Sequence, residues 1–212
     1  MKKLVLALAI ATAGAVYAKT TPVMGSLFTP VQAPDAEYDV KGLRLSLVYG
    51  ECQTFTGLDL GIANRSRKSF SGLGIGGGNI VDGTLYGGQL GLVNWNYQAG
   101  SGKDGRSLGA QLGLVNYATG FCGLQDGVVS VARNKVLGVQ WSLVNYTKDL
   151  DGLQCGYCFL FAANFVEGRM NGCQIGLFNY AAVVESGIQI GLVNMIGKGG
   201  FAHVMPIING KF

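Results

Sequence analysis

The sequence of 212 residues is poor in charge and in histidine. Charged residues make up 13% of the chain and hydrophobic residues 49%. This balance excludes an intrinsically disordered chain, which combines low hydrophobicity with high net charge. The single histidine, His203, excludes the histidine-rich zinc sites. The 35 glycines lack the three-residue period of collagen, so they need another explanation.

No stretch offers the 18 or so uninterrupted apolar residues of a transmembrane helix. The longest run, Leu4 to Val16, follows Lys2 and Lys3 and ends near the small residue Ala18. A short positive start, an apolar core and a small-residue cleavage point are typical of a secretory signal peptide, which we predict at residues 1–18. We therefore expect an exported protein.

A repeat fills the rest of the chain. Residues 172–194 read GCQIGLFNYAAVVESGIQIGLVN, in which the phrase G-x-Q-I-G-L-x-N occurs twice, fifteen residues apart. Most units are 14 or 15 residues long, and such short intervals indicate a repeat architecture. Counted from the first glycine of the phrase, position one falls at Gly42, Gly57, Gly72, Gly87, Gly109, Gly123, Gly138, Gly152, Gly172, Gly187 and, weakly, Ala202.

Apolar residues alternate with Gln and Gly inside each unit. Positions two, four and six are mostly Leu, Ile or Val, and this period of two predicts a strand that buries them and turns Gln at position three and Gly at position five outward. On this interpretation Leu114→Asp should unfold the array, and Gln111→Asp should be mild. A second apolar row predicts a short strand that returns across the core: Phe70, Leu85, Val136, Leu150 and Val184.

Asparagine at position eight decides between two folds. Parallel coils, stacked about 4.8 Å apart, would place these side chains above one another in a hydrogen-bonded ladder. We therefore predict an all-β fold, a parallel β-solenoid of about eleven 15-residue coils. The alternative is an antiparallel outer-membrane β-barrel of 10–12 strands, in which alternate Asn residues would lie at opposite rims. The predicted ladder comprises Asn64, Asn79, Asn94, Asn116, Asn145, Asn179, Asn194 and Asn209.

Departures from the repeat suggest how the chain is organised. Residues 19–41 hold three of the four prolines and do not match the repeat, so we predict an N-terminal cap there. Residues 42–212 form the array, with longer intervals that predict excursions at 96–107 and 161–171. Pro206 cannot donate a hydrogen bond to a further strand, which suits the terminal edge.

Motifs for catalysis or cofactor binding are lacking. Cys155 and Cys158 have the spacing of thiol redox centres, but residues three apart on a strand point to opposite faces, so we predict buried apolar thiols. The G-x-S-x-G signature of serine hydrolases does not occur. Removal of Lys2 and Lys3 lowers the formal charge from +4 to +2, too little to capture nucleic acid. We expect no enzyme, no cofactor and no metal site.

The G-[VIL]-Q-[VIL]-G-L-V-N units resemble those of a family of exported bacterial surface-repeat proteins. The resemblance includes AEYDVKGLRLSLVYG at residues 36–50 and the ending MPIINGKF. It implies export in Gram-negative bacteria and a surface or outer-membrane association, so we expect a location in the periplasm, the outer membrane or the cell surface. It transfers no functional residues. Two functions remain: a structural or interaction protein of the envelope, which binds an unknown protein or envelope component through its Gln/Gly face or its loops, or a membrane-embedded barrel for transport or anchoring. The oligomeric state stays open.

Overall fold

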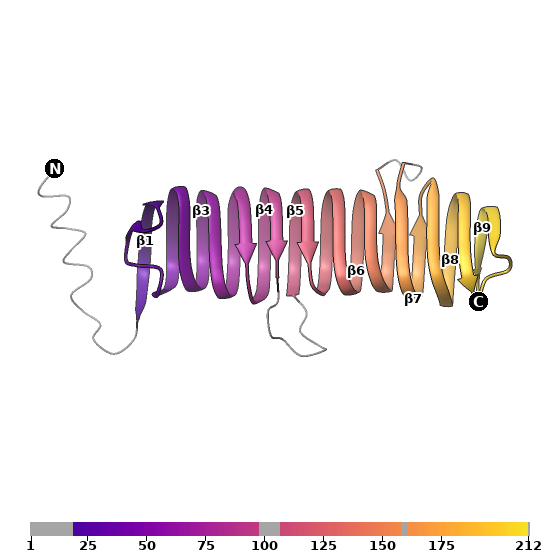
Figure 1. Ribbon diagram of the computed structural model, residues 1–212, viewed down its shortest axis with the longest axis horizontal. Helices are drawn as coiled ribbons and strands as arrows, with labels where there is room; N and C mark the ends of the chain where they lie inside the picture. The colour runs from indigo at the N-terminus through magenta and orange to yellow at the C-terminus, as the bar shows by residue number, and fades with distance from the viewer. Residues whose placement is uncertain (1–18, 98–106, 158–160, 212) are drawn as a thin grey trace, which may run out of the picture.

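The fold is a rod of stacked β-coils (Figure 1). A computed structural model describes residues 19–97, 107–157 and 161–211, so the predicted signal peptide lies outside the described residues. Every regular element within these ranges is a strand. They are β1 (Thr20–Phe28), β2 (Val31–Ala33), β3 (Asp39–Val81), β4 (Thr84–Asn96), β5 (Ser107–Ala118), β6 (Phe121–Cys155), β7 (Ala163–Ile175), β8 (Phe178–Lys198) and β9 (Val204–Lys211).

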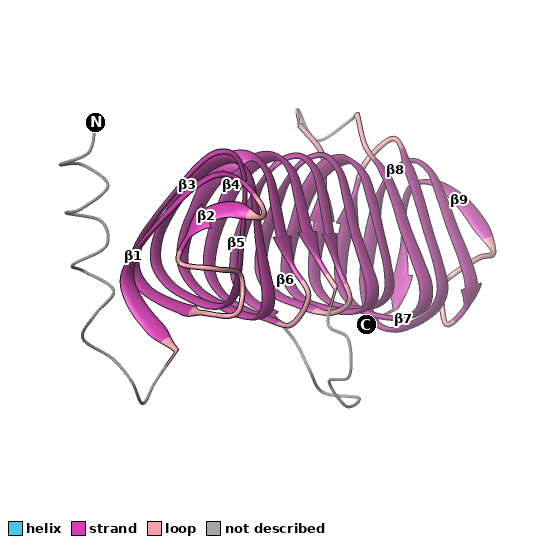
Figure 2. Ribbon diagram, turned by 60° about the vertical axis from the view of Figure 1, so that its left-hand side comes forward, coloured by secondary structure: helices cyan, strands magenta, loops and turns pink. Residues whose placement is uncertain are grey.

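Neighbouring coils pair in parallel, one repeat apart. Gly72 lies opposite Gly87, and Asn79 lies opposite Asn94, so equal positions of successive units meet. The strands form one sheet in the order β2-β1-β3-β4-β5-β6-β7-β8-β9, which winds around the rod axis (Figure 2). Within the described ranges, antiparallel pairing is confined to β1–β2 and β8–β9 at the two ends. This open, mostly parallel sheet confirms the β-solenoid and not the antiparallel barrel.

Glycine at position one turns the chain at the start of each coil. All ten of these glycines, from Gly42 to Gly187, have φ between 124° and 149°. Side chains of L-residues rarely adopt this region. At Gly109, a Cβ atom would lie 1.8 Å from the carbonyl oxygen of Gly87 in the preceding coil. The tight turn and the close approach of the coils both require glycine there.

The C-terminal end of the array differs from the prediction. Ala202 was expected to begin an eleventh coil, but β9 runs antiparallel to β8, with Ile207 opposite Gly191. Alanine does not readily take the φ that each coil start requires, so the winding stops after the unit that begins at Gly187. The array therefore has ten glycine-led units, and β9, which contains Pro206, covers the last one.

At the N-terminal end, the predicted cap region contributes strands to the same sheet. Within residues 19–41, β1 pairs in parallel with β3, so Gly25 lies opposite Leu45. The short strand β2 then pairs with β1 in the antiparallel sense and forms the outer edge. The first repeat unit is therefore covered by a further turn of chain.

The second excursion lies earlier in the chain than predicted. Residues 163–171 belong to β7 and are not a loop, since Asn164 lies opposite both Asn145 and Asn179. An ideal Cβ on Gly156 would lie 2.4 Å from the Cβ of Ala162, so these two residues take neighbouring positions in the stack, and residues 158–160 between them lie outside the described residues. Of the first predicted excursion, residues 98–106 lie outside the described residues.

The two faces of the repeat strand are the reverse of those predicted. Gln residues at position three are at most 1% exposed, whereas the Leu, Ile and Val residues at position six are 39–65% exposed. Position-five glycines face inward beside asparagine: a Cβ on Gly113 would lie 2.7 Å from Nδ2 of Asn94. Because positions three and five point inward, positions two, four and six must point outward.

The second apolar row is buried as predicted. Its five residues are at most 2% exposed and lie in two core clusters that together run the length of the rod. Phe55 stacks on Phe70 at a centroid distance of 5.2 Å, one coil apart. The interior therefore has an apolar side, formed by this row, and a polar side, formed by Gln and Asn.

The reversal of the faces predicts opposite effects for two aspartate substitutions. Gln111→Asp places an unpaired charge in the interior and should cost about 3–5 kcal/mol of unfolding free energy. Leu114→Asp lies on the surface and should change it by only about 0.5 kcal/mol. Denaturant unfolding of both variants measures the difference. If Leu114→Asp lost more unfolding free energy than Gln111→Asp, the leucine face would be the buried one, as hydropathy alone predicts.

Candidate functional site

Seven glutamines form a continuous amide ladder inside the rod. Each Nε2, from Gln111 to Gln189, donates to Oε1 of the Gln in the preceding coil at 2.6–2.9 Å. Nε2 also donates to the position-nine carbonyl of its own coil in several units, as from Gln174 to Tyr180 O at 3.1 Å. Both amide protons are then used, which allows a polar group to be buried.

The asparagines form a second ladder with the opposite direction. Asn79 Nδ2 donates to Asn94 Oδ1 at 3.0 Å, and Asn94 Nδ2 donates to Asn116 Oδ1 at 2.9 Å. The same Nδ2 donates to the position-four carbonyl of the following coil, as from Asn94 to Leu112 O at 2.9 Å. Gln donors point toward the N-terminal end and Asn donors toward the C-terminal end, so the amide dipoles of the two ladders oppose each other.

The eight predicted ladder residues fall into three groups. One hydrogen-bonded run comprises Asn64, Asn79, Asn94 and Asn116, and a second comprises Asn145, Asn164, Asn179 and Asn194. Asn209 lies outside both, because its side chain binds Phe201 N and Ala202 O and closes the terminal loop. Asn164 was missed because the excursion displaces it from the fixed spacing, although Ala163-Asn164-Phe165 matches the Val-Asn-Tyr of other units.

A pair of serines separates the two runs. Ser130 takes position eight where Asn is usual, and Ser142 takes position five of the next coil where Gly is usual. Their Oγ atoms lie 2.7 Å apart. Elsewhere a side chain at position five would clash with the Asn below, so the two substitutions compensate for each other. The break leaves Oδ1 of Asn145 without a hydrogen-bond partner among the described residues.

A buried ion pair replaces the Gln ladder in the first two units. Arg44 Nε donates to Asp59 Oδ1 at 2.7 Å, and Arg44 Nη1 donates to Arg65 O at 2.8 Å. Burial raises the pKa of the Asp59 carboxyl, and the hydrogen bonds from Arg44 oppose that shift. Gly74 follows at position three, and Nε2 of Gln89 has no hydrogen-bond partner in the described part of the chain. The ladder thus begins at Gln89.

Reactive groups are dispersed through the part of the chain that the structure describes. No group of three or more His, Cys, Asp or Glu residues there could hold a metal ion. Cys155 is fully buried, and burial raises the pKa of its thiol to about 11, so it is protonated at neutral pH. Cys158 lies outside the described residues. His203 is exposed, with Nδ1 3.2 Å from Ile196 O. No described helix could span a membrane.

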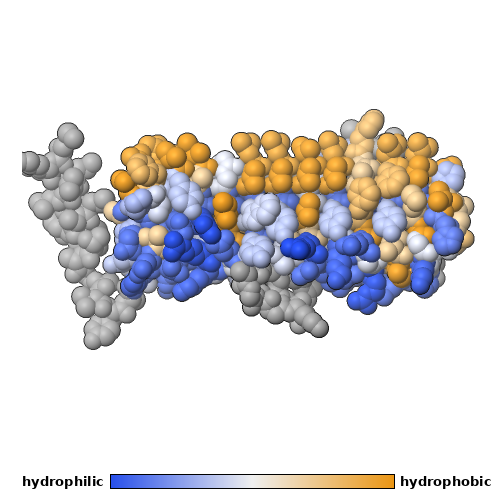
Figure 3. Space-filling model, viewed as in Figure 1, coloured by the Kyte–Doolittle hydropathy of each residue, from blue (hydrophilic) through white to orange (hydrophobic). Residues whose placement is uncertain are grey.

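The outer surface carries an apolar ridge, formed by positions six and seven of the ten units and interrupted at Gly77 and Gly78. Figure 3 shows it as a hydrophobic band along one edge of the rod. Its most exposed side chains are 37–65% accessible, and contiguous apolar patches of this kind mark interaction sites. They are Leu47, Val48, Ile62, Leu92, Val93, Leu114, Val128, Leu143, Val144, Leu177 and Leu192.

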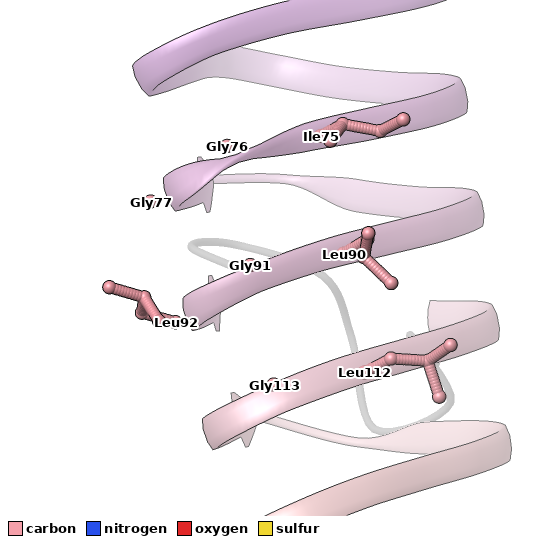
Figure 4. Close-up of a pocket in the computed structure, with 8 residues that line it drawn as sticks. All are labelled: Ile75, Gly76, Gly77, Leu90, Gly91, Leu92, Leu112 and Gly113. Atoms are coloured by element: carbon pink, nitrogen blue, oxygen red, sulfur yellow. The ribbon is translucent and has the colours of Figure 1, made fainter.

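A second apolar row runs beside the ridge, at position four. In Figure 4, Ile75, Leu90 and Leu112 project from one side of the strand and Leu92 from the other side of the bend at Gly91. The hollow between the two rows has a glycine floor and a volume of about 550 Å³. A similar hollow of about 540 Å³ lies between Leu45 and Ile62. The ridge therefore has an uneven apolar flank.

Aromatic and then charged residues follow the ridge on its other flank. Position nine holds Trp95 and Tyr117, which stack at a centroid distance of 4.1 Å. The turn beyond carries charged side chains in most units, including the exposed Lys68 and Lys148. Around one coil the surface thus changes from apolar to aromatic to charged. Further aromatic residues at position nine are Tyr146, Phe165 and Tyr180.

Comparisons with known proteins give no match: no protein-family model, no curated protein and no solved structure is similar to this chain. The geometry of the rod and of its surface therefore supplies the functional argument. The Gln residues that were expected to form the binding face are buried, so that expectation is wrong. The apolar ridge is the candidate site in its place.

The serine pair predicts a compensated double substitution. Ser130→Asn alone should destabilise the rod by about 1–3 kcal/mol, because the longer side chain meets that of Ser142. Adding Ser142→Gly removes the obstruction and joins the two Asn runs, so most of the loss should be recovered. Denaturant unfolding of the two singles and the double gives the coupling energy. Additive effects would show that the two positions are independent.

The Asn ladder predicts a second coupling. Asn116→Ala removes the acceptor of Asn94 Nδ2 and should cost about 1–3 kcal/mol of unfolding free energy. The double variant Asn94→Ala, Asn116→Ala should cost clearly less than the sum of the singles, because one shared hydrogen bond is counted twice in that sum. Asn134→Ala, at an exposed asparagine outside the ladder, is the control and should have little effect. Additivity within about 0.3 kcal/mol would contradict the ladder.

Proposed function

We propose that this chain is a non-enzymatic, exported structural or interaction protein of the bacterial envelope, a rigid rod that binds lengthwise through its apolar ridge. The ridge is the observation that carries the proposal. Fully buried side chains are normal for Leu, Ile and Val, yet here Leu47, Ile62, Leu92 and Leu192 are each at least 60% exposed. These side chains are aligned on one edge of the rod and form an apolar surface. Because the contact of such a surface with water is unfavourable, the edge is expected to bind a partner.

Rigidity supports a structural role. The two amide ladders and the parallel backbone pairing connect each coil to its neighbours, so the ridge is held straight along the rod. A buried polar network in which most groups are hydrogen-bonded favours one arrangement of the interior. The signal-peptide pattern of residues 1–18 supports export, which a location in the envelope requires. A transport role as a membrane barrel is set aside, because the sheet is not closed.

The ridge variant Leu92→Asp, Leu114→Asp tests this function in the bacterium that encodes the chain. These two residues lie in adjacent coils and are 60% and 53% exposed, so the rod should still fold. We expect the wild type to sediment with the envelope fraction and most of the variant to become soluble. The matched control is Leu108→Asp, Leu137→Asp, which changes leucines that are 50% and 40% exposed on another side of the coil. Equal envelope association of all three proteins would refute the proposal.

A further inference from the structure

We infer that the occupant of the ridge is a lipid surface, along which the rod lies with positions six and seven in the boundary between headgroups and acyl chains. This inference rests on the proposed function, since it names the partner of the same surface. Three features of the described residues favour lipid: the uniform chemistry of the ridge, the order of residue types beside it, and its uneven relief.

The ridge carries no polar side chain at any of its positions in the ten units. Position six reads Leu47, Ile62, Gly77, Leu92, Leu114, Val128, Leu143, Ala162, Leu177 and Leu192, and position seven reads Val48, Ala63, Gly78, Val93, Val115, Val129, Val144, Ala163, Phe178 and Val193. A protein partner is recognised through a few anchoring residues within a polar rim, and hydrogen bonds fix the register. A uniform apolar ridge offers no such register, but it suits a medium of hydrocarbon chains.

The residue types beside the ridge follow the polarity of a membrane interface. Trp95 and Tyr117 border the ridge, and Trp and Tyr prefer the headgroup level of a bilayer. Charged residues lie at the next bend of the same coil, further from the ridge, where they would remain in water. Phe161, 67% exposed, directly precedes Ala162 of the ridge. A rod lying on a bilayer would place each of these groups at its favoured depth.

The one acidic group in the position-four row, the carboxyl group of Asp126, is hydrogen-bonded to a tyrosine. Asp126 accepts a hydrogen bond from the hydroxyl of Tyr157, a residue that reaches across from a later coil. That bond raises the pKa of Tyr157 to about 12, so the hydroxyl keeps its proton at neutral pH. The ring of Trp141 lies beside Tyr157, at a centroid distance of 6.4 Å. The carboxylate therefore has a donor, which lessens the penalty of placing it near hydrocarbon.

The relief of the ridge also favours a fluid partner. Gly77 and Gly78 leave a gap in it, and the two hollows beside it differ in their lining. A second copy would present the same projecting ridge, and two rigid ridges in contact leave such hollows empty. Empty hollows lose the dispersion contacts that make an interface favourable. Acyl chains can follow both the ridge and the hollows.

Vesicle flotation of the purified full chain tests the inference, with vesicles of phosphatidylethanolamine and phosphatidylglycerol. We expect the wild type to float with the vesicles. Leu92→Asp, Leu114→Asp should lower the partition coefficient at least about tenfold, since each leucine loses the transfer free energy of a whole side chain. The control Leu108→Asp, Leu137→Asp should float like the wild type.

A gain-of-binding variant guards against loss by misfolding. Nothing lies within 4 Å of an ideal Cβ on Gly78, and its φ is not in the left-handed region, so Gly78→Val should fold normally. It fills the gap in the ridge and should raise the partition coefficient about three- to tenfold. Unchanged partitioning of this variant would contradict a lipid-facing ridge.

The remaining outcomes separate this inference from the proposed function. If the wild type does not float but sediments as a dimer that Leu92→Asp, Leu114→Asp dissociates, the ridge binds a second copy and the lipid inference fails. If it neither floats nor dimerises, yet its envelope association depends on the ridge, the partner is an envelope protein and the lipid inference again fails. In both cases the proposed function stands. It would be overturned if the ridge variant associated with the envelope as well as the wild type does.

Discussion

The hydrogen bonds between stacked side-chain amides are the interaction on which the rest of this structure depends. An amide buried in the rod must satisfy two N–H donors and a carbonyl oxygen, and here the coils above and below supply most of the partners. Asn94 receives a hydrogen bond from Asn79 and donates one to Asn116. Such a line works only if the same residue recurs at the same height in each coil, which explains why the sequence repeats.

The ladders also fix what the other positions must do. Asparagine fills the space over position five, so that position is glycine in most units. The alternate positions of the same strand then face solvent, whatever their hydropathy. Leu at positions four and six is thus exposed by the geometry of the polar interior, and position seven is exposed beside the bend of the coil (Figure 4). The apolar contribution to stability comes mainly from the other row, in which Phe70, Leu85 and Leu150 are buried.

Much of the architecture could be predicted from the sequence. The Gly interval gave the coil length, the Asn recurrence favoured parallel stacking, and the row from Phe70 to Val184 was correctly placed in the core. The faces could not be predicted from hydropathy, because a buried Gln such as Gln111 is stable only when its neighbours share its bonds, a property of the stack and not of one unit. Asn164 and Ala202 were misassigned because an excursion and an antiparallel strand interrupt the spacing.

Two departures from the repeat inside the rod come as matched pairs across neighbouring coils. Arg44 is paired with Asp59, and Ser130 with Ser142, because a change in one coil leaves an unsatisfied or crowded group in the next. The outside of the rod has no such constraint, since no ladder connects the side chains of positions six and seven. The interior therefore does not require leucine, isoleucine or valine there. Their uniform apolarity along ten units must instead reflect the medium that the ridge contacts.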